Sequence, residues 1–296
     1  MWIGVTPRFR QFIQNLNLSV DEYGRGIMRY EDVTGSLNRG YFGKTDGGIG
    51  SLVVGSWGKG TAISPSGDVD IYYRVPVSLY EQFDNYSGNG QSALLADVRD
   101  KLLITNPQTK ISADGQIVVV AFNSLPQMEI APSFLTNDGK YILPNTNDGG
   151  SWITADPVAE NQALNYADAI CSNNARPLVK MAKRWRYQCS VPIKSFHLEL
   201  LACSFLPTCS WKDRDFYFYD WIVRDFFRFL VEKANSLVFA PGTLEAMNIG
   251  DAWHSKAETA LKRAEKACEF EYNDWVHLAG EEWQKIFGAA IPEAVL

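Results

Sequence analysis

Several features that mark particular protein classes are missing from this chain of 296 residues. Its five cysteines include no Cys-x-x-Cys pair, so a disulfide framework is not indicated and a reducing, cytoplasmic setting is expected. No segment approaches the roughly 20 consecutive apolar residues that cross a membrane. The opening stretch, MWIGVTPRFRQFIQ, lacks the apolar core and the cleavage site of a signal peptide.

The chain also lacks an excess of positive charge. Its net charge is −6 and its pI is near 5.2, whereas proteins that bind long nucleic acids usually carry a basic surplus. A long nucleic-acid partner is therefore not expected. Nucleotides remain compatible as small ligands, because a few local lysines and metal ions suffice to hold their phosphates.

The chain does have enough apolar material for a large core. Hydrophobic residues make up 46% of it, and nine residues are tryptophan. This composition predicts a globular protein with one large domain or two closely packed ones. No internal repeat or low-complexity tract is evident. Four tryptophans are assigned to packing: Trp185, Trp211, Trp221 and Trp275.

The pattern changes along the chain. Residues 6–45 have a helical pattern, with Ser19 and Asp21 as candidate N-caps. Between residues 50 and 145 lie the β-forming segments SLVVGS, DVDIYYRVP, QIVVVAF and MEIAPSF, with a helix, ALLADVRDKLL, between the second and third. From Pro157 onward long amphipathic patterns predominate. We therefore expect an α+β protein, with a sheet lobe at residues 1–150, a helical lobe at residues 151–296, and an active cleft between them. The N-terminal helices are counted with the sheet lobe and are expected to span both lobes.

The most informative motif is Asp68-Val69-Asp70, which follows an apolar strand and a Gly55-Ser56 turn. Successive side chains of a strand point to opposite faces, so the two aspartates share one face. Adjacent carboxylates repel each other unless a cation lies between them, and Mg²⁺ is typically held by one or two carboxylates plus substrate phosphates. The backbone N–H groups of the turn can hold a phosphate. The motif therefore indicates phosphoryl or nucleotidyl transfer.

Two other local patterns are weaker. The segment Gly58–Thr61 resembles part of a Walker A loop, but that loop requires a glycine where Val53 stands and a Ser or Thr where Gly60 stands. A zinc site is the second alternative, from four widely spaced residues: Cys189, His197, Cys203 and Cys209. Zinc ligands normally occur in tighter pairs, and these residues lie in an apolar run of helical pattern, so packed core positions are favoured.

A family resemblance rests on these segments. The pattern is an apolar residue, then Gly-Ser, then a gap of about ten residues, then Asp-apolar-Asp. This pattern resembles the signature of the polymerase-β-like nucleotidyltransferases, which require a third carboxylate on a later strand. Glu129, in the segment MEIAPSF, is the candidate for this third carboxylate. Six segments are together similar to the cyclic GMP-AMP synthase/DncV-like nucleotidyltransferases, which are the CD-NTases of bacterial anti-phage signalling (CBASS). These segments are LNRGYF, GSWGKGTAI, MEIAP, the K-x-W element around Lys183, KSFHLE and EEWQKIFG. The resemblance covers nearly the whole chain, and the motif set is closest to clade E.

The resemblance implies a function. The expected protein is a cytoplasmic bacterial, template-independent, Mg²⁺-dependent nucleotidyltransferase. It would join NTPs into a cyclic dinucleotide or oligonucleotide second messenger that a downstream effector reads. It is expected to be a monomer with no membrane partner.

The resemblance also implies roles for particular residues. Asp68, Asp70 and Glu129 would be catalytic and would bind two Mg²⁺ ions, for which Mn²⁺ can substitute. Glu129 is one methylene longer than the Asp common at this position. The nucleotide phosphates would be held by four residues: Gly55, Ser56, Lys183 and Ser195.

Two alternatives stay open. One is transfer of a nucleotide to an external acceptor, such as an RNA 3′ end, a protein or a small molecule, because the three carboxylates alone are shared with poly(A) polymerases, tRNA CCA-adding enzymes and antibiotic nucleotidyltransferases. The other is a catalytically inactive nucleotide-binding protein. The missing basic tracts weigh against RNA, and the presence of all three carboxylates weighs against inactivity.

Overall fold

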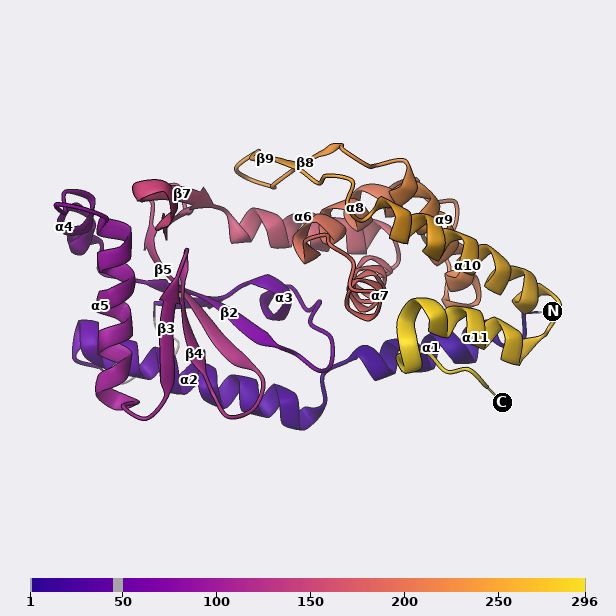
Figure 1. Ribbon diagram of the computed structural model, residues 1–296, viewed down its shortest axis with the longest axis horizontal. Coiled ribbons are helices and arrows are strands. Elements are labelled where there is room, and N and C mark those ends of the chain that lie inside the picture. The colour runs from indigo at the N-terminus through magenta and orange to yellow at the C-terminus, as the bar shows by residue number, and fades with distance from the viewer. Residues whose placement is uncertain (1, 45–49, 296) are drawn as a thin grey trace. The chain divides into compact units, whose positions relative to one another are not determined.

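The computed structural model describes residues 2–44 and 50–295 (Figure 1). The chain divides into two units, of which one is Leu18–Ala159 and the other joins Met1–Asn17 to Glu160–Leu296. The second boundary therefore follows Ala159, whereas the sequence predicted a division after residue 150. The first unit carries a seven-stranded sheet and the second is mainly helical, which confirms the predicted α+β class.

The sheet unit has one parallel strand pair at its centre. The strand order is β1 (Ser51–Val53), β2 (Asp68–Arg74), β5 (Gln127–Leu135), β4 (Ile117–Ala121) and β3 (Lys110–Asp114), with β6 (Tyr141–Asn145) and β7 (Ser151–Ala155) continuing from β5. Strands β2 and β5 are parallel, and the other described neighbours are antiparallel. The helices of this unit are α2 (Val20–Phe42), α3 (Gly55–Gly58), α4 (Tyr80–Asp84) and α5 (Gly90–Thr105), with 3₁₀ turns at Val77–Leu79 and Asn147–Gly149.

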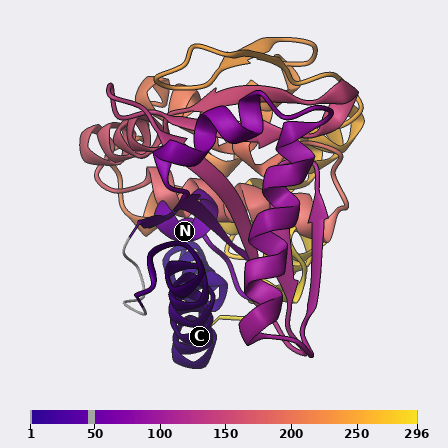
Figure 2. The same ribbon diagram turned by 90° about the vertical axis from the view of Figure 1, so that its left-hand side faces the viewer.

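One face of the central strands is buried. It is formed by alternate residues of three strands: Val69, Ile71, Tyr73, Val118, Val120, Met128 and Ile130. Helices α2 and α5 supply the apolar side chains that cover it, and Figure 2 shows α5 in front of the strands. Fully burying one such side chain stabilises the fold by about 1.5–3 kcal/mol. A shift of one residue in strand register would turn all of these apolar side chains toward solvent. Burial of this face therefore fixes the register, and with it the side chains that lie on the opposite face of the sheet.

Helix α2 begins at the predicted N-cap. The Ser19 side chain accepts a hydrogen bond from Glu22 N, and the Glu22 carboxylate accepts one from Ser19 N, which forms a capping box. Asp21 lies in the first turn, where a negative charge favours the helix dipole. The helix ends at Gly43, whose φ of 65° is left-handed. The predicted end of the helical stretch, residue 45, lies outside the described residues.

The helical unit is built from seven helices, a short hairpin and three 3₁₀ turns. The helices are α1 (Val5–Leu16), α6 (Pro157–Ile170), α7 (Ala175–Gln188), α8 (Ser195–Phe205), α9 (Tyr219–Val231), α10 (His254–Tyr272) and α11 (Val276–Phe287). The hairpin is β8 (Leu237–Phe239) with β9 (Ala246–Asn248), and the turns are Leu206–Thr208, Phe216–Phe218 and Gly288–Ala290. Across the described ranges, every helix is too short or too polar to span a lipid bilayer.

The tryptophans assigned to packing differ in their burial. Trp185 is fully buried, and Trp211 and Trp221 are partly buried. Trp275 is 51% exposed, and its ring packs on Phe270 with centroids 5.6 Å apart. It lies at the break between α10 and α11, where Asp274 has a left-handed φ of 56°, so the chain turns before this side chain can enter the helical core.

Candidate active site

The three predicted carboxylates lie on one face of two neighbouring strands. Asp68 and Asp70 are on β2, and Glu129 on β5 is the register partner of Asp70. Because the strands run parallel and side chains alternate, register partners point to the same side of the sheet. Their neighbours Val69 and Met128 point into the core, and the three acids are each only partly buried. The acids therefore share the open face.

The acids influence one another's charge. Burial raises the pKa of Glu129, and the negative charge of Asp68 raises it further. Among the described residues, no hydrogen bond or positive charge contributes to lowering it. A cation placed at this face would offset both effects, because it stabilises the ionised carboxylates.

The acids do not by themselves make a closed metal cage. Within the part of the chain that the structure describes, no three His, Cys, Asp or Glu side chains are arranged as a metal site. Mg²⁺ usually keeps several waters and is completed by substrate phosphates, so an open set of carboxylates fits it. Oxygen ligands also suit Mn²⁺. The chemistry of the donors therefore agrees with the predicted ions.

The Gly55-Ser56 turn lies against one of the acids. Gly55 has a φ of +57°, and a Cβ atom there would lie 1.9 Å from Asp70 Oδ2. Only glycine satisfies both the left-handed backbone and the close approach. The backbone N–H of Val54 donates to Asp70 O at 2.9 Å, and the Ser56 carbonyl accepts from Thr61 N at 2.8 Å. The turn is thereby fastened beside the carboxylates.

Helix α3, which begins at this turn, and the loop after it are held by contacts that sequence reasoning missed. Trp57 packs on Gly26 of α2, where a Cβ would lie 2.2 Å from the indole ring. Tyr23 stacks on the same ring with centroids 5.7 Å apart, and Trp57 Nε1–H donates to Ser66 Oγ at 2.7 Å. The available signal was a glycine inside a helix of 23 residues, which weakens a helix unless packing requires it. These residues position the loop.

The other two predicted phosphate ligands belong to the helical unit. Lys183 lies in α7, is buried and has an interaction partner of its own. Ser195 is the first residue of α8 and is partly exposed, and α7 packs against α8. The structure thus brings five predicted residues together in the sheet unit and these two in the other. A shared site for all seven stays a prediction.

The residues weighed as zinc ligands lie in and around α8. His197 and Cys209 are buried, and Cys189 and Cys203 are partly buried. Burial lowers the pKa of His197, and the nearby charge of Lys194 lowers it further. These side chains are packed among the helices, as the apolar pattern around them favoured.

A family model matches much of the chain. The Second Messenger Oligonucleotide or Dinucleotide Synthetase domain, abbreviated SMODS, matches residues 4–167. A search of curated proteins finds no match.

Solved structures with the same fold cover nearly the whole chain. The cyclic AMP-GMP synthase DncV of Vibrio cholerae, in complex with the linear intermediate pppA(3′,5′)pG, has a TM-score of 0.74 at 13% identity, with 97% of each chain covered. CdnC of E. coli MS115-1, in complex with HORMA-deltaN, has a TM-score of 0.72 at 18% identity, with 98% of each covered. The CD-NTase CdnG of Bradyrhizobium diazoefficiens, in complex with GTP, has a TM-score of 0.69 at 14% identity, covering 96% of this chain and 95% of CdnG.

These likenesses show a shared fold, and the family match spans more than half of the 296 residues. The predicted family is confirmed: the chain belongs to the SMODS domain family, the CD-NTases.

Proposed function

We propose that this protein is a template-independent nucleotidyltransferase that joins NTPs into a cyclic dinucleotide or oligonucleotide second messenger for anti-phage defence. The observation that carries the proposal is the register pairing of Asp70 with Glu129, beside Asp68 and the Gly55 turn. Membership of the SMODS family supports the same chemistry. Membership of clade E stays a prediction.

The proposed catalytic groups are the three carboxylates. Asp68, Asp70 and Glu129 would hold two Mg²⁺ ions, or Mn²⁺ in their place. When bound, such ions polarise phosphoryl oxygens and make an attacking hydroxyl a better nucleophile. The carboxylates fix the geometry in which a 2′- or 3′-hydroxyl of one nucleotide faces the α-phosphate of another. The new P–O bond forms as the bond to pyrophosphate breaks, and a second round closes the ring.

The proposed phosphate ligands act by backbone dipoles and by charge. Gly55, which lies against Asp70, and Ser56 would offer their backbone N–H groups to phosphate, and such turns favour anions. Lys183 would add a point charge and Ser195 a hydroxyl on the triphosphate tail. Pyrophosphate carries much of the negative charge that develops on the leaving group, so these groups assist its departure.

The relatives support NTPs as substrates. The DncV structure contains pppA(3′,5′)pG, and the CdnG structure contains GTP. We extend nucleotide binding to this chain, together with a cytoplasmic bacterial location, a monomeric state and a downstream effector that reads the product.

Incubating the purified protein with Mg²⁺ and all four NTPs, without any acceptor, tests the proposal. Phosphatase-resistant dinucleotides or oligonucleotides in the mass spectrum are the expected result. A protein that is silent alone but labels added RNA, protein or small molecules would be a transferase to an external acceptor. Tight nucleotide binding without turnover under every condition would indicate an inactive binding protein.

A further inference from the structure

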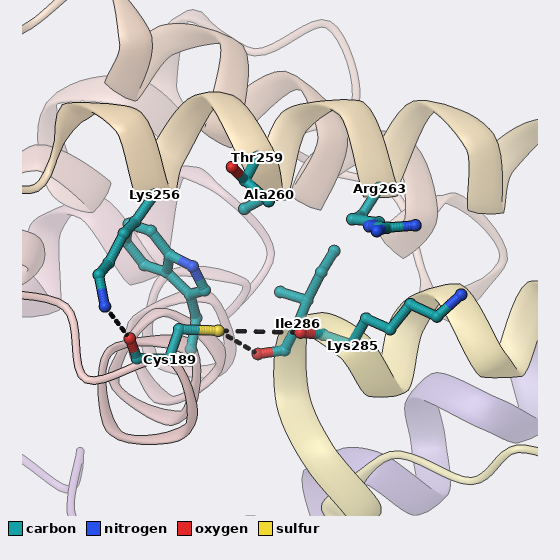
Figure 3. Close-up of a pocket in the computed structure, with 8 residues that line it drawn as sticks. Cys189, Lys256, Thr259, Ala260, Arg263, Lys285 and Ile286 are labelled. Atoms are coloured by element: carbon teal, nitrogen blue, oxygen red, sulfur yellow. Dashed lines mark hydrogen bonds between the residues drawn. The ribbon is translucent and has the colours of Figure 1, made fainter.

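A cavity of about 250 Å³ lies in the helical unit between α10, α11 and the end of α7 (Figure 3). Eight residues line it; three of them are cationic and none is acidic. Figure 3 shows Lys256, Thr259 and Arg263 on one side of α10, with Cys189 and Lys285 across the cavity. The cavity wall is therefore strongly positive.

The nearby carboxylate does not neutralise this charge. Glu282 is buried and forms ion pairs with Arg263 at 2.9 Å, with Lys266 at 3.0 Å and with Lys285 at 3.0 Å. Burial acts to raise the pKa of Glu282, but hydrogen bonds from these three cations lower it to about 2. One negative charge thus faces three positive ones. The guanidinium of Arg263 has five N–H donors, so donors remain for a second acceptor.

Lys256 adds a fourth cation whose charge is also not neutralised. Its ammonium donates hydrogen bonds to the backbone carbonyls of Cys189 and Ser190. Among the described residues no carboxylate forms an ion pair with it. Cys189 cannot accept the charge as a thiolate, because burial raises the pKa of its thiol despite the nearby Lys256 charge. An anion entering the cavity would meet this ammonium as well.

The wall also contains a buried donor without an acceptor. The Trp185 side chain lines the cavity and is fully buried, and its Nε1 has no hydrogen-bond partner in the described ranges. An indole can only donate, and leaving a buried donor unpaired costs free energy. The ring is held edge-to-face against Phe227, with centroids 5.1 Å apart. This N–H group lies inside the wall, where the partial positive charge on its hydrogen adds to the positive potential of the cavity.

We propose that this cavity binds an oxyanion of the size of phosphate or pyrophosphate. The cationic side chains of Lys256, Arg263 and Lys285 supply charge-assisted hydrogen bonds. The volume of about 250 Å³ lies below the roughly 300–1,000 Å³ of pockets for larger organic ligands, so a compact anion fits best. Its source is either free in solution or the pyrophosphate that the proposed reaction releases.

This site is distinct from the predicted phosphate grip at Lys183. Trp185 follows Lys183 by two positions in α7, which on an α-helix turns a side chain by about 200°. The two side chains therefore leave the helix on different sides. The cavity is a separate anion site on the other side of α7.

Isothermal titration calorimetry of the full chain with inorganic phosphate, and separately with pyrophosphate, tests the site. EDTA and constant ionic strength remove contributions from metal-bound anions and from screening. We expect one anion per chain. We also expect Arg263→Gln to raise the Kd by about tenfold, as loss of one charge-assisted contact predicts.

Lys266→Gln is the matched control. Lys266 forms the same kind of ion pair with Glu282 but does not line the cavity, so the variant should keep the wild-type Kd. Lys256→Gln removes the cavity cation that donates only to backbone carbonyls, and should also raise the Kd.

Three results would overturn the proposal. The first is that wild-type protein binds neither anion. The second is that Arg263→Gln and Lys266→Gln weaken binding equally, which would indicate a general charge effect. The third is that Lys183→Ala abolishes binding while Arg263→Gln preserves it, which would place the anion at the predicted nucleotide site.

Discussion

Asp70 and Glu129 are register partners on the parallel strands β2 and β5. Alternation along one strand brings Asp68 and Asp70 to the same face, and strand pairing adds the third acid to them. Rigid sheet backbone holds all three, and the Gly55 turn is fastened to the same strand by the Val54–Asp70 hydrogen bond. Sites built on strands hold their groups more closely than sites on loops.

Replacing Gly55 with alanine should damage activity more than stability. The new Cβ would collide with Asp70 Oδ2 and displace a carboxylate, and a misplacement of this size can lower kcat/KM by about a hundredfold. The left-handed backbone should cost about 1–2 kcal/mol. Steady-state kinetics and chemical denaturation measure the two effects.

Gly115→Ala is the control for backbone strain. Gly115 has a φ of 58°, and no described atom lies within 4 Å of the position that its Cβ would take, so the variant should show a similar loss of stability with unchanged activity. Equal activities for the two variants would contradict the proposed contact between the turn and the carboxylate.

Glu129 should make the metal-free protein less stable as the pH rises. Its folded-state pKa is raised above the ordinary value of 4.5, so the folded state favours the protonated acid. The contribution of Glu129 to the free energy of unfolding is therefore fully present below pH 4.5 and is lost as the pH rises through the raised pKa. In EDTA, Glu129→Gln should melt at a higher temperature than wild type at pH 8, and the difference should vanish toward pH 4.5.

Adding Mg²⁺ at pH 8 should reverse this order. A ligand that binds only the folded state stabilises it, and wild type offers the complete set of three carboxylates. A melting temperature of Glu129→Gln that rises with Mg²⁺ as much as that of wild type would remove Glu129 from the metal site.

Lys183→Ala should raise the apparent KM for NTPs by about tenfold or more, because the variant loses one charge-assisted contact to phosphate. The control is Lys180→Ala on the same helix, because Lys180 Nζ donates to Asn17 Oδ1 at 2.8 Å and is assigned no ligand. Initial rates over a range of NTP concentrations measure both. Identical KM values for the two variants would take Lys183 out of the phosphate grip.

Arg8→Met should destabilise the helical unit. Arg8 and Glu271 form a fully buried ion pair at 2.7 Å, and Arg8 also donates to the carbonyls of Val276 and Glu293. Removing one partner of a buried pair costs about 3–5 kcal/mol. The double variant Arg8→Met with Glu271→Leu should recover much of this loss, because no buried charge is left unpaired.

The exposed Arg10 is the control. Its guanidinium lies 5.8 Å from the centroid of the Phe216 ring, so Arg10→Met should change the free energy of unfolding by no more than about 1 kcal/mol. Urea denaturation measures all three variants. Equal losses for Arg8→Met and Arg10→Met would show that the buried ion pair does not anchor α1 to the C-terminal segment.

Local patterns predicted the parts of this fold whose cause is local. The alternation of β2 separates acids from core residues, and Ser19 with Glu22 closes a capping box within one turn. The strands found from sequence are those with continuous apolar or alternating patterns, such as Ile117–Ala121.

The remaining features depend on contacts between distant segments or on weak patterns. Strand β3 is mostly exposed and has no apolar signature. Strands β8 and β9 have three residues each, so even the apolar Leu-Val-Phe of β8 is too short a run to predict a strand. The pairing of Asp70 with Glu129 requires the order of strands in the sheet. The contact of Trp57 with Gly26 joins the short helix α3 to α2 earlier in the chain, and a sequence alone does not disclose such a partner.

The most direct test compares wild type with Asp68→Asn/Asp70→Asn for conversion of α-labelled NTPs in the presence of Mg²⁺. Both side chains lie on the open face, so the variant should keep the wild-type fold by circular dichroism. We expect wild type to form phosphatase-resistant product and the double variant to lose at least about a thousandfold in rate, the loss of several kcal/mol of metal-assisted stabilisation. A folded double variant that forms the product at the wild-type rate would contradict the assignment of the active site to these carboxylates.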